Sequence, residues 1–402
     1  MADGARSDHP AVQRQLDRLA ARPLAGDRLG LETITILLAR LGRPQDALPP
    51  VFHVAGTNGK GSTGAFLRAG IEAAGLRAHV FTSPHLVRFN ERIRIAGRLI
   101  DDDTLADLLD EVLSASDEVS FFEATTAAAF LAFARTPADA CIIEVGLGGR
   151  LDATNVIERP AACGIASIGI DHQAWLGTTL AEIAREKAGI AKRGVPLIVL
   201  AQPPEALTAT EAMAEERGAP VLLEGRAWTV DATLRPTLPG AHQRRNGNLA
   251  WQMLLASGLP VSLDRFRSGL ARAEWPARLQ RLAPGPLAGS RDIMVDGAHN
   301  EDAATALASH LAQEPRHLIL GILANKDAAA IIETLRPHAL SLTFVAVPDH
   351  ESHDPEALAK EFEGRAAPSI EQALAPLAGP ILIAGSLYLA GAVLAANREF
   401  PD

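Results

Sequence analysis

The chain has 402 residues and a net charge of −10, and 48% of its residues are hydrophobic while 21% are charged. This length allows two or three domains with separate cores. The acidic balance argues against nucleic acid as a partner, because nucleic-acid binding requires a basic face, and no apolar run is long enough to span a bilayer. Cys141 and Cys163 lie in apolar runs typical of buried thiols, and the N-terminus lacks the apolar segment of a signal peptide. We therefore expect a cytoplasmic protein.

Short apolar strands alternate with helices from Val51 onward. Near-continuous apolar strands separated by helices are typical of a mostly parallel sheet covered on both faces. The expected strands of this first series are 51–55, 78–82, 141–145, 163–168 and 196–200. The expected helices are 9–20, 31–41, 63–74, 104–113, 122–134 and 179–192, with a further helix that ends near Ser257.

A second alternating series follows the segment 281–290. This segment contains two prolines and two glycines, so it is the best candidate for a linker. The sequence therefore predicts a larger domain over 1–283 and a smaller α/β domain over 291–402. The smaller domain is expected to have strands at 293–296, 317–323, 342–347 and 381–385, and helices at 300–313, 328–335, 355–362 and 387–397.

The stretch from Val51 to Thr63 carries the strongest chemical signal. An apolar strand enters a glycine-rich loop that carries Lys60, and a helix follows. Converging backbone N–H groups, the helix dipole and the lysine charge make such a loop a cradle for phosphate, and Ser62 is placed to reach a metal ion that bridges phosphates. The loop departs from the usual GxxxxGK[ST] pattern, since Val54 replaces the first glycine and Gly61 separates Lys60 from Ser62. An ordinary glycine turn is the alternative.

Polar side chains also follow other expected strands, and in open parallel sheets ligands bind beyond the carboxyl ends of the strands. Glu144 closes one apolar strand, where a carboxylate suits a magnesium ion or caps the strand beside a turn. Asp171 and His172 follow another, and the histidine is either a ligand or structural.

Three further groups of residues are candidates for chemistry, and each has a structural explanation for at least part of it. Asp296, His299 and Asn300 crowd one turn in the second series, and a helix cap explains one of them. The charged helix 179–192 reads as a solvated face with ion pairs along it. The aromatic and polar stretch 121–126 suits a flat heteroaromatic ligand, or else is a helix start with buried phenylalanines.

Taken in order, these stretches resemble the folylpolyglutamate synthase and dihydrofolate synthase family, within the ATP-dependent amide ligases that include the Mur ligases. The resemblance covers nearly the whole chain and departs from the commoner pattern at Asn325 and Glu301. Its motifs are Gly56-Thr-Asn-Gly-Lys-Gly-Ser62, Ser83-Pro-His-Leu86, Phe89-Asn-Glu-Arg-Ile93, Phe122-Glu123, Glu144-Val-Gly-Leu-Gly-Gly-Arg-Leu-Asp-Ala-Thr-Asn155, Asp171-His172, Trp175-Leu-Gly177, Arg185-Glu-Lys-Ala-Gly-Ile190, His242-Gln243 with Asn246, Trp275-Pro276 with Arg278, Asp296-Gly-Ala-His-Asn300 and Gly385-Ser-Leu-Tyr-Leu389.

The resemblance implies a fold and a role for each motif. The fold would be a P-loop-type ATPase domain with a mostly parallel sheet, followed by a smaller Rossmann-like α/β domain. ATP would be bound by Asn58, Gly59, Lys60, Gly61, Asn246, Arg278 and Asp296. Mg²⁺ would be held by Ser62, Glu144 and His172. Lys187 matches a lysine that is carbamylated in the family, and His299 would lie near the transferring phosphate. The pteroate ligand would contact Ser120, Phe121, Phe122, Glu123, Leu151, Asp152 and Ala153.

The implied activity is an ATP-dependent ligase that joins L-glutamate to dihydropteroate, to the glutamyl tail of reduced folates, or to both, through an acyl phosphate. We expect a monomer that acts on small molecules, without nucleic acid or membrane. A Mur-type ligase acting on a nucleotide-linked muramyl peptide would carry a substrate domain ahead of the ATP loop, whereas 50 residues precede Val51. A non-catalytic nucleotide-binding module would not need the metal ligands.

Overall fold

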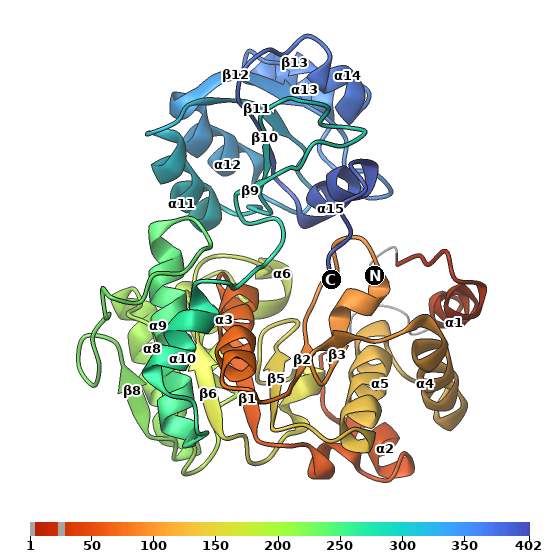
Figure 1. Ribbon diagram of the computed structural model, residues 1–402, viewed down its shortest axis with the longest axis vertical. Coiled ribbons are helices and arrows are strands. Elements are labelled where there is room, and N and C mark those ends of the chain that lie inside the picture. The colour runs from red at the N-terminus through yellow and green to blue at the C-terminus, as the bar shows by residue number, and fades with distance from the viewer. Residues whose placement is uncertain (1–4, 23–28) are drawn as a thin grey trace. The chain divides into compact units, whose positions relative to one another are not determined.

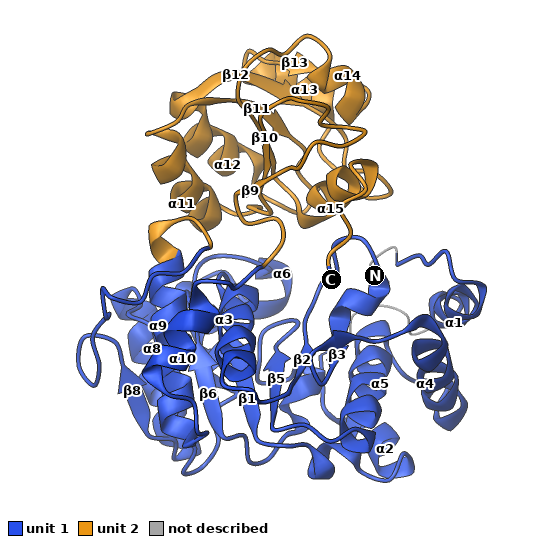
Figure 2. Cartoon of the chain, in the orientation of Figure 1, with its two compact units in different colours: residues 1–237, 243–274, 402 blue, residues 238–242, 275–401 orange. Residues whose placement is uncertain are grey.

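The computed structural model describes residues 5–22 and 29–402; residues 1–4, part of the N-terminus discussed above, and 23–28 lie outside the described residues. The chain forms two compact units (Figure 2). Unit 1 comprises 1–237, 243–274 and residue 402, and unit 2 comprises 238–242 and 275–401. Both are α/β, as the sequence predicts. In the described part of the chain, no helix is long and apolar enough to cross a bilayer.

Unit 1 is built on a sheet that has eight strands in the described residues, in the order β4-β3-β2-β5-β1-β6-β7-β8. The six strands from β2 to β8 in that order are parallel, and β3 and β4 add an antiparallel edge. The parallel arrangement agrees with the near-continuous burial of the central strands. The strands are β1 (Val51–Ala55), β2 (Ala78–Phe81), β3 (Ile93–Ile95), β4 (Arg98–Leu99), β5 (Ala140–Glu144), β6 (Ala162–Ile165), β7 (Leu197–Val199) and β8 (Val221–Leu223).

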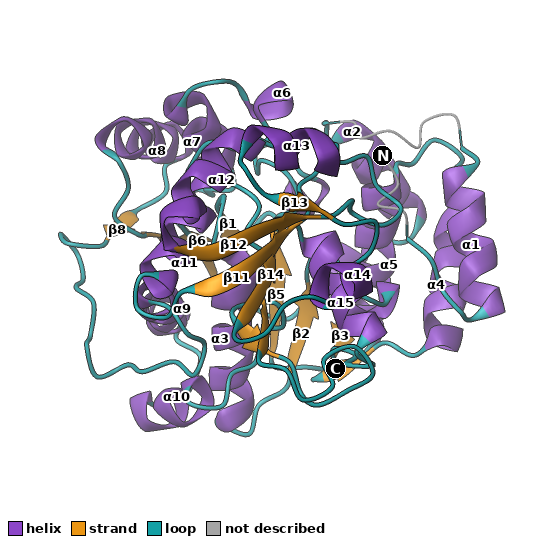
Figure 3. Cartoon of the chain, turned by 90° about the horizontal axis from the view of Figure 1, so that it is seen from above, coloured by secondary structure: helices purple, strands orange, loops and turns teal. Residues whose placement is uncertain are grey.

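Helices cover both faces of this sheet (Figures 1 and 3). On one face α3 and α9 approach closely, since a Cβ on Gly64 would lie 3.5 Å from Ile142 and one on Gly164 would lie 2.4 Å from Met253. On the other face α5, α7 and α8 pack on apolar side chains of the central strands. The helices are α1 (Pro10–Ala20), α2 (Glu32–Arg40), α3 (Lys60–Ala73), α4 (Asp102–Ala115), α5 (Phe121–Arg135), α6 (Gln173–Leu176), α7 (Leu180–Ala188), α8 (Pro204–Arg217), α9 (Ala241–Ser257) and α10 (Leu263–Leu270).

Unit 2 has a second sheet, in the order β13-β12-β11-β14-β10-β9, with every pair parallel except β9 with β10. Helices α11 to α13 share one apolar cluster with this sheet. The strands are β9 (Gln280–Arg281), β10 (Ile293–Val295), β11 (Arg316–Leu320), β12 (Ala339–Phe344), β13 (Arg365–Ala366) and β14 (Ile381–Ala384). The helices are α11 (Glu301–Leu311), α12 (Ala328–Leu335), α13 (Pro355–Glu361), α14 (Ile370–Leu374) and α15 (Leu387–Ala396).

The segment expected to be a linker, 281–290, lies inside unit 2 in the structure, and the units divide between Glu274 and Trp275. Strand β9 pairs with β10, so the proline- and glycine-rich stretch is the connection of a hairpin. Leu282 and Leu287 are buried there, and a Cβ on Gly285 would lie 2.4 Å from the Asn397 side chain. Turn residues can close a hairpin as well as open a linker, and the sequence pattern alone did not distinguish the two.

Helix α3 begins at Lys60, three residues before the position expected from periodicity. Gly59 has φ 90°, a left-handed conformation that glycine adopts without steric cost. This residue ends the turn, so Lys60, Gly61 and Ser62 occupy the first helical turn instead of the loop.

Candidate active site

The phosphate loop of unit 1, residues Gly56–Gly59, joins β1 to α3. Two of its glycines are required by geometry. Gly56 has φ 152° and a Cβ there would lie 2.9 Å from the Cβ of Ala166, while a Cβ on Gly59 would lie 2.7 Å from Oδ1 of Asn246 in α9. The backbone N–H groups in the first turn of α3 have no acceptor within the helix, and the helix dipole adds positive potential there. This arrangement suits an anion such as a phosphate group.

Lys60 lies at the first position of α3, and its side chain curls back over the loop. Its Nζ donates to the carbonyl oxygens of Gly56 at 3.1 Å and Thr57 at 3.4 Å. Ser62, two residues further along in the same first turn, is buried. The lysine charge and the serine hydroxyl therefore lie on either side of the helix start, as expected for residues that contact phosphate and its metal ion.

The other expected metal ligands lie at or after the ends of the two strands that flank β1, at the same edge of the sheet. Glu144 is the last residue of β5 and is paired with Val54 of β1. His172 follows β6, the other neighbour of β1, and has a left-handed backbone with φ 53°. Its Nε2 lies 4.0 Å from Oδ1 of Asp171. Since parallel strands end at one edge, the loop emerges between the carboxylate and the imidazole segments.

The donor set at this edge fits a magnesium ion. Within residues 5–22 and 29–402, no group of three or more His, Cys, Asp or Glu side chains could hold a metal ion. An ion here would therefore need oxygens in addition to Glu144, such as the Ser62 hydroxyl and the phosphates of a nucleotide. Magnesium is usually bound in this way, by one or two carboxylates together with substrate phosphates.

Lys187 faces inward from α7 and reaches the phosphate loop. Its side chain is 4% exposed, and its Nζ donates to the carbonyl oxygen of Gly56 at 3.1 Å. The interpretation of this helix as a solvated charged face is correct only for its outer side, where Glu182 caps the helix and Arg185 pairs with Glu216. The helical face that a residue occupies depends on what the helix packs against, so the inward lysine could not be inferred from the charge run.

The glycine-rich loop after β5 joins Lys187 to the segment expected to contact the pteroate ligand. A Cβ on Gly149 would lie 2.9 Å from the carbonyl oxygens of Glu186 and Lys187, so glycine allows α7 to pack directly on this loop. Asp152 is buried, and burial raises the pKa of its carboxyl group. Its oxygens accept hydrogen bonds from the backbone N–H groups of Leu147 and Thr154. The carboxylate therefore fixes the shape of the loop.

The other expected pteroate segment is the start of α5. Ser120 and Glu123 cap this helix reciprocally, each side chain accepting from the backbone N–H of the other. Phe121 is buried and meets Phe89 edge to face, with ring centroids 5.7 Å apart. Phe122 is half-buried, and a Cβ on Gly146 would lie 2.4 Å from its ring. Of these four residues, Phe122 has the side chain that borders the glycine-rich loop.

Neither Leu151 nor Ala153 contributes a polar group to this region. Leu151 is half-buried and Ala153 begins a short 3₁₀ helix, Ala153–Val156, that follows the glycine-rich loop. The two expected pteroate segments therefore supply apolar and aromatic side chains, while their polar members hold the local backbone.

In unit 2, the expected nucleotide-binding residues gather at the end of β10. Asp296 accepts hydrogen bonds at 2.8 Å from the backbone N–H groups of Leu279 and Ala298. Arg278 lies between two residues in the left-handed region, Ala277 with φ 55° and Leu279 with φ 46°. Non-glycine residues adopt this conformation rarely, and such residues cluster at active sites and ligand clamps. Asp296 and Arg278 are thus brought together by one strained turn.

His299 and Asn300 have separate functions in the same turn. Nδ1 of His299 lies 2.8 Å from the carbonyl oxygen of Gly297. Asn300 caps α11 by accepting from the N–H of Ala303 at 3.0 Å. The helix cap therefore explains Asn300, as expected for one of the three residues, and leaves Asp296 and His299 as candidates for chemistry.

One residue of this region was not identified from the sequence. His53 of β1 is fully buried, and its Nε2 lies 2.9 Å from the hydroxyl of Thr154, which donates to Asp152. A histidine within an otherwise apolar strand is the signal that could have indicated it. The imidazole therefore links the strand ahead of the phosphate loop to the glycine-rich loop.

His53 makes the stability of the chain depend on pH. Burial lowers the pKa of its imidazole from 6.5 to about 3. Below pH 6.5 the unfolded chain binds a proton at this residue that the folded chain does not, so stability is lost as the pH falls toward 3. The loss between pH 6.5 and 4.5 is about 2–3 kcal/mol. Urea unfolding at these two pH values should show a smaller loss for His53→Gln than for the native chain; equal losses would contradict this account.

Several known proteins are similar to this chain in sequence and in structure. A family model described as "Mur ligase, glutamate ligase domain" matches residues 277–387, which lie in unit 2. The folylpolyglutamate synthase of Lacticaseibacillus casei is 35% identical to the chain, over 90% of the chain and 92% of that protein. The dihydrofolate synthase/folylpolyglutamate synthase of Bacillus subtilis is 36% identical, over 80% of the chain and 82% of that protein. The chain belongs to the folylpolyglutamate synthase/dihydrofolate synthase family.

The solved structure of E. coli FolC in complex with DHPP and ADP has the same fold. It superposes with a TM-score of 0.87 and is 31% identical, and the match covers 96% of this chain and 97% of that one. The two-sheet architecture and the predicted resemblance are therefore confirmed. The chain is an ATP-dependent ligase of folate metabolism, like the members of the family to which it belongs.

Proposed function

We propose that the chain joins L-glutamate to dihydropteroate, to the glutamyl tail of reduced folates, or to both, through an acyl phosphate. Two relatives support this choice of substrates. E. coli FolC has been solved with DHPP and ADP, and a bifunctional folylpolyglutamate synthase/dihydrofolate synthase, 30% identical to the chain, has been solved with Mn, AMPPNP and L-glutamate. The observation that carries the proposal is the convergence of Lys60 and Lys187 on Gly56 of the phosphate loop, beside Glu144 at the end of the adjacent strand.

In the proposed site, Asn58 to Gly61 hold the ATP phosphates, and Asn246, Arg278 and Asp296 bind the rest of the nucleotide. Ser62, Glu144 and His172 hold Mg²⁺, and Lys187 is carbamylated, which turns a cation into an anion able to help position the ion. Bound there, the ion neutralises charge on the phosphates during transfer. Phe122 and the loop around Leu151 contact the pteroate ring system.

The chemistry requires an activated carboxylate, because oxide is too poor a leaving group for an amine to displace. A carboxylate oxygen of the pteroate or folate attacks the γ-phosphorus, and the bond to the bridging oxygen breaks to release ADP. The glutamate nitrogen then attacks the acyl carbon, and inorganic phosphate leaves from the tetrahedral intermediate. Lys60 stabilises the negative charge of the transferring group, and His299 lies near that phosphate. Catalysis is thus mainly positioning and charge neutralisation.

We also propose that the enzyme acts as a monomer in the cytoplasm, on small molecules alone. The net charge of −10 supports the exclusion of nucleic acid. A Mur-type substrate and a non-catalytic nucleotide module are the less favoured alternatives, because the similar proteins over most of the chain are synthases that act on folates.

Substrate choice can be tested by following ADP release. The purified chain is given ATP, magnesium and L-glutamate, with dihydropteroate or tetrahydrofolate added separately. We expect ADP release that requires glutamate together with at least one of the two pteridine substrates. The response to each substrate then decides between dihydrofolate synthase, folylpolyglutamate synthase and a bifunctional enzyme. Release without glutamate, or none with either substrate, would contradict the proposal.

A further inference from the structure

The phosphate loop is held in place by the segment that follows β6. The backbone N–H groups of Thr57 and Asn58 both donate to the carbonyl oxygen of Ser167, at 2.7 and 3.2 Å. The Thr57 hydroxyl adds a contact of 3.0 Å to the carbonyl oxygen of Gly169. A glycine-rich loop has many accessible conformations. The position of Ser167 therefore decides where the loop presents Lys60 and the first turn of α3.

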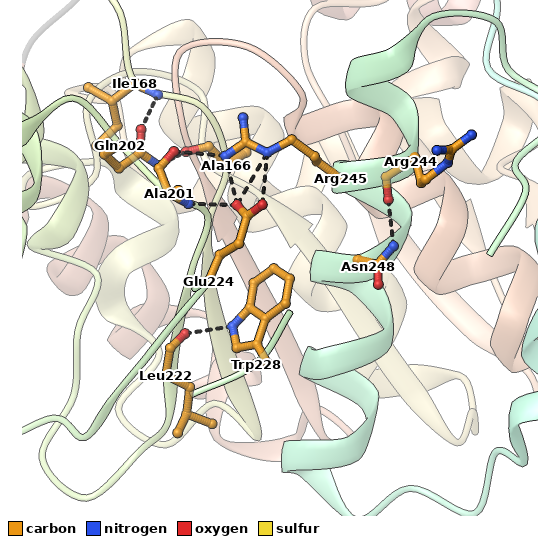
Figure 4. Close-up of polar contacts among 10 residues, drawn as sticks. All are labelled: Ala166, Ile168, Ala201, Gln202, Leu222, Glu224, Trp228, Arg244, Arg245 and Asn248. Carbon is orange, nitrogen blue, oxygen red and sulfur yellow. Dashed lines mark hydrogen bonds and ion pairs between the residues drawn. The ribbon is translucent and has the colours of Figure 1, made fainter. Parts of the chain in front are cut away.

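One side chain forms hydrogen bonds with the backbone on both sides of Ser167. Gln202, in the loop after β7, donates from Nε2 to the carbonyl oxygen of Ala166 at 2.8 Å and accepts at Oε1 from the N–H of Ile168 at 3.0 Å. The amide thus bonds to the residues immediately before and after Ser167, as Figure 4 shows. No other amide orientation would satisfy both backbone groups, since one is an acceptor and the other a donor.

The residues next to Gln202 connect it to α9, which also contacts the phosphate loop. Glu224, just beyond β8, accepts from the N–H of Ala201 at 2.7 Å and pairs with Arg245 of α9 at 2.7 Å. Arg245 also donates to the carbonyl oxygen of Ala201 at 2.8 Å (Figure 4). The next residue of α9 is Asn246, whose side chain lies against Gly59. The ion pair therefore fixes the helix turn that carries Asn246.

We propose that Gln202 is a positioning residue for ATP, and that the Glu224–Arg245 pair supports it by holding Asn246 against Gly59. Gln202 acts through Ser167 on the N–H groups of Thr57 and Asn58, and touches no substrate. Its effect is to pre-order the phosphate loop, so that binding ATP does not have to order it. The inference rests on the proposed function, because it assumes that the loop between β1 and α3 binds the phosphates of ATP.

The test compares ATP affinity with general stability. Gln202→Leu removes both hydrogen bonds and keeps a side chain of similar size. Gln202→Glu keeps the acceptor for the N–H of Ile168 but places a carboxylate oxygen against the carbonyl oxygen of Ala166. We expect the Kd for a non-hydrolysable ATP analogue, measured by calorimetry with magnesium, to rise about tenfold in both variants, as for the loss of one or two such bonds. The KM for glutamate should stay at its native value. Arg245→Met should also raise the Kd for the analogue.

Two matched controls remove similar groups away from the loop. Gln313→Leu changes an exposed glutamine after α11, and Arg226→Met breaks the exposed Arg226–Glu211 ion pair near α8. Both should bind the analogue as the native chain does. If Gln202 had only a structural role, Gln202→Leu would lower the urea midpoint and leave the Kd for the analogue unchanged. This result would overturn the inference about Gln202 but not the proposed function. If the native chain itself failed to bind the analogue, the proposed function would fail with it.

Discussion

Lys60→Ala should lower kcat for ligation by about a hundredfold or more, as for other preorganised charges that stabilise a transition state. The Nζ of Lys60 lies over the phosphate loop, within 3.1 Å of the carbonyl oxygen of Gly56. No other lysine lies in the loop or the first turn of α3. Since the charge that it neutralises is largest during phosphoryl transfer, kcat should fall more than the affinity for ATP. ADP release under saturating substrates measures the effect.

The fold should survive this change, because the lysine is only half-buried. Circular dichroism and urea unfolding should match the native chain. Lys360→Ala is the matched control: Lys360 is an exposed residue of α13, and its removal should leave turnover unchanged. Near-native turnover in Lys60→Ala would count heavily against the phosphate cradle.

Lys187→Ala should lose ligase activity, and added bicarbonate should not restore it. In the structure the Lys187 amine is buried and bonds to the loop carbonyl of Gly56. If the amine carries a carbamate, the variant lacks an anion beside the metal position that no bicarbonate can rebuild without the amine. A small carboxylic acid that diffuses into the space left by the side chain should partly restore turnover. Activity assays with and without such acids measure this rescue.

Lys187→Arg separates charge from carbamylation. Arginine keeps a positive charge at the end of α7 but cannot form the carbamate, so this variant should also be inactive. The native enzyme, in contrast, should lose activity when carbon dioxide and bicarbonate are removed and regain it when they return. Full activity of Lys187→Ala, or of Lys187→Arg, would exclude the carbamate role. Arg185→Ala, which removes an exposed cation from the same helix, is the control and should remain active.

The parts of the site that are local in sequence were predicted closely. A strand, a glycine turn and a helix start form one continuous stretch, so the phosphate loop could be identified from Val51–Thr63 alone. The position of α3 was missed by three residues, because the left-handed Gly59 ends the loop earlier than the apolar periodicity indicates. The hairpin at β9 was read as a linker for a related reason: turn residues show that the chain turns, but not what pairs on either side.

The other parts of the candidate site depend on contacts between segments that are far apart in the sequence. The order β5-β1-β6 places Glu144 and His172 on either side of the phosphate loop, and strand order follows from packing of the whole sheet. The inward direction of Lys187 follows from the contact of α7 with Gly149, more than thirty positions earlier in the chain. At the sequence level, position after a strand made Glu144 and His172 candidates, and the family resemblance decided between the alternatives and supplied the role of Lys187.

The sequence by itself determined the α/β class, the phosphate loop and the family of this protein, because each can be recognised from segments that are contiguous in the sequence. Only the tertiary structure decided which side chains support the loop. Gln202 bonds to the backbone of residues 34 and 36 positions away, and His53 to a threonine 101 positions away. Such contacts leave no local pattern, since a backbone carbonyl or N–H is present at nearly every residue and folding alone selects the partner.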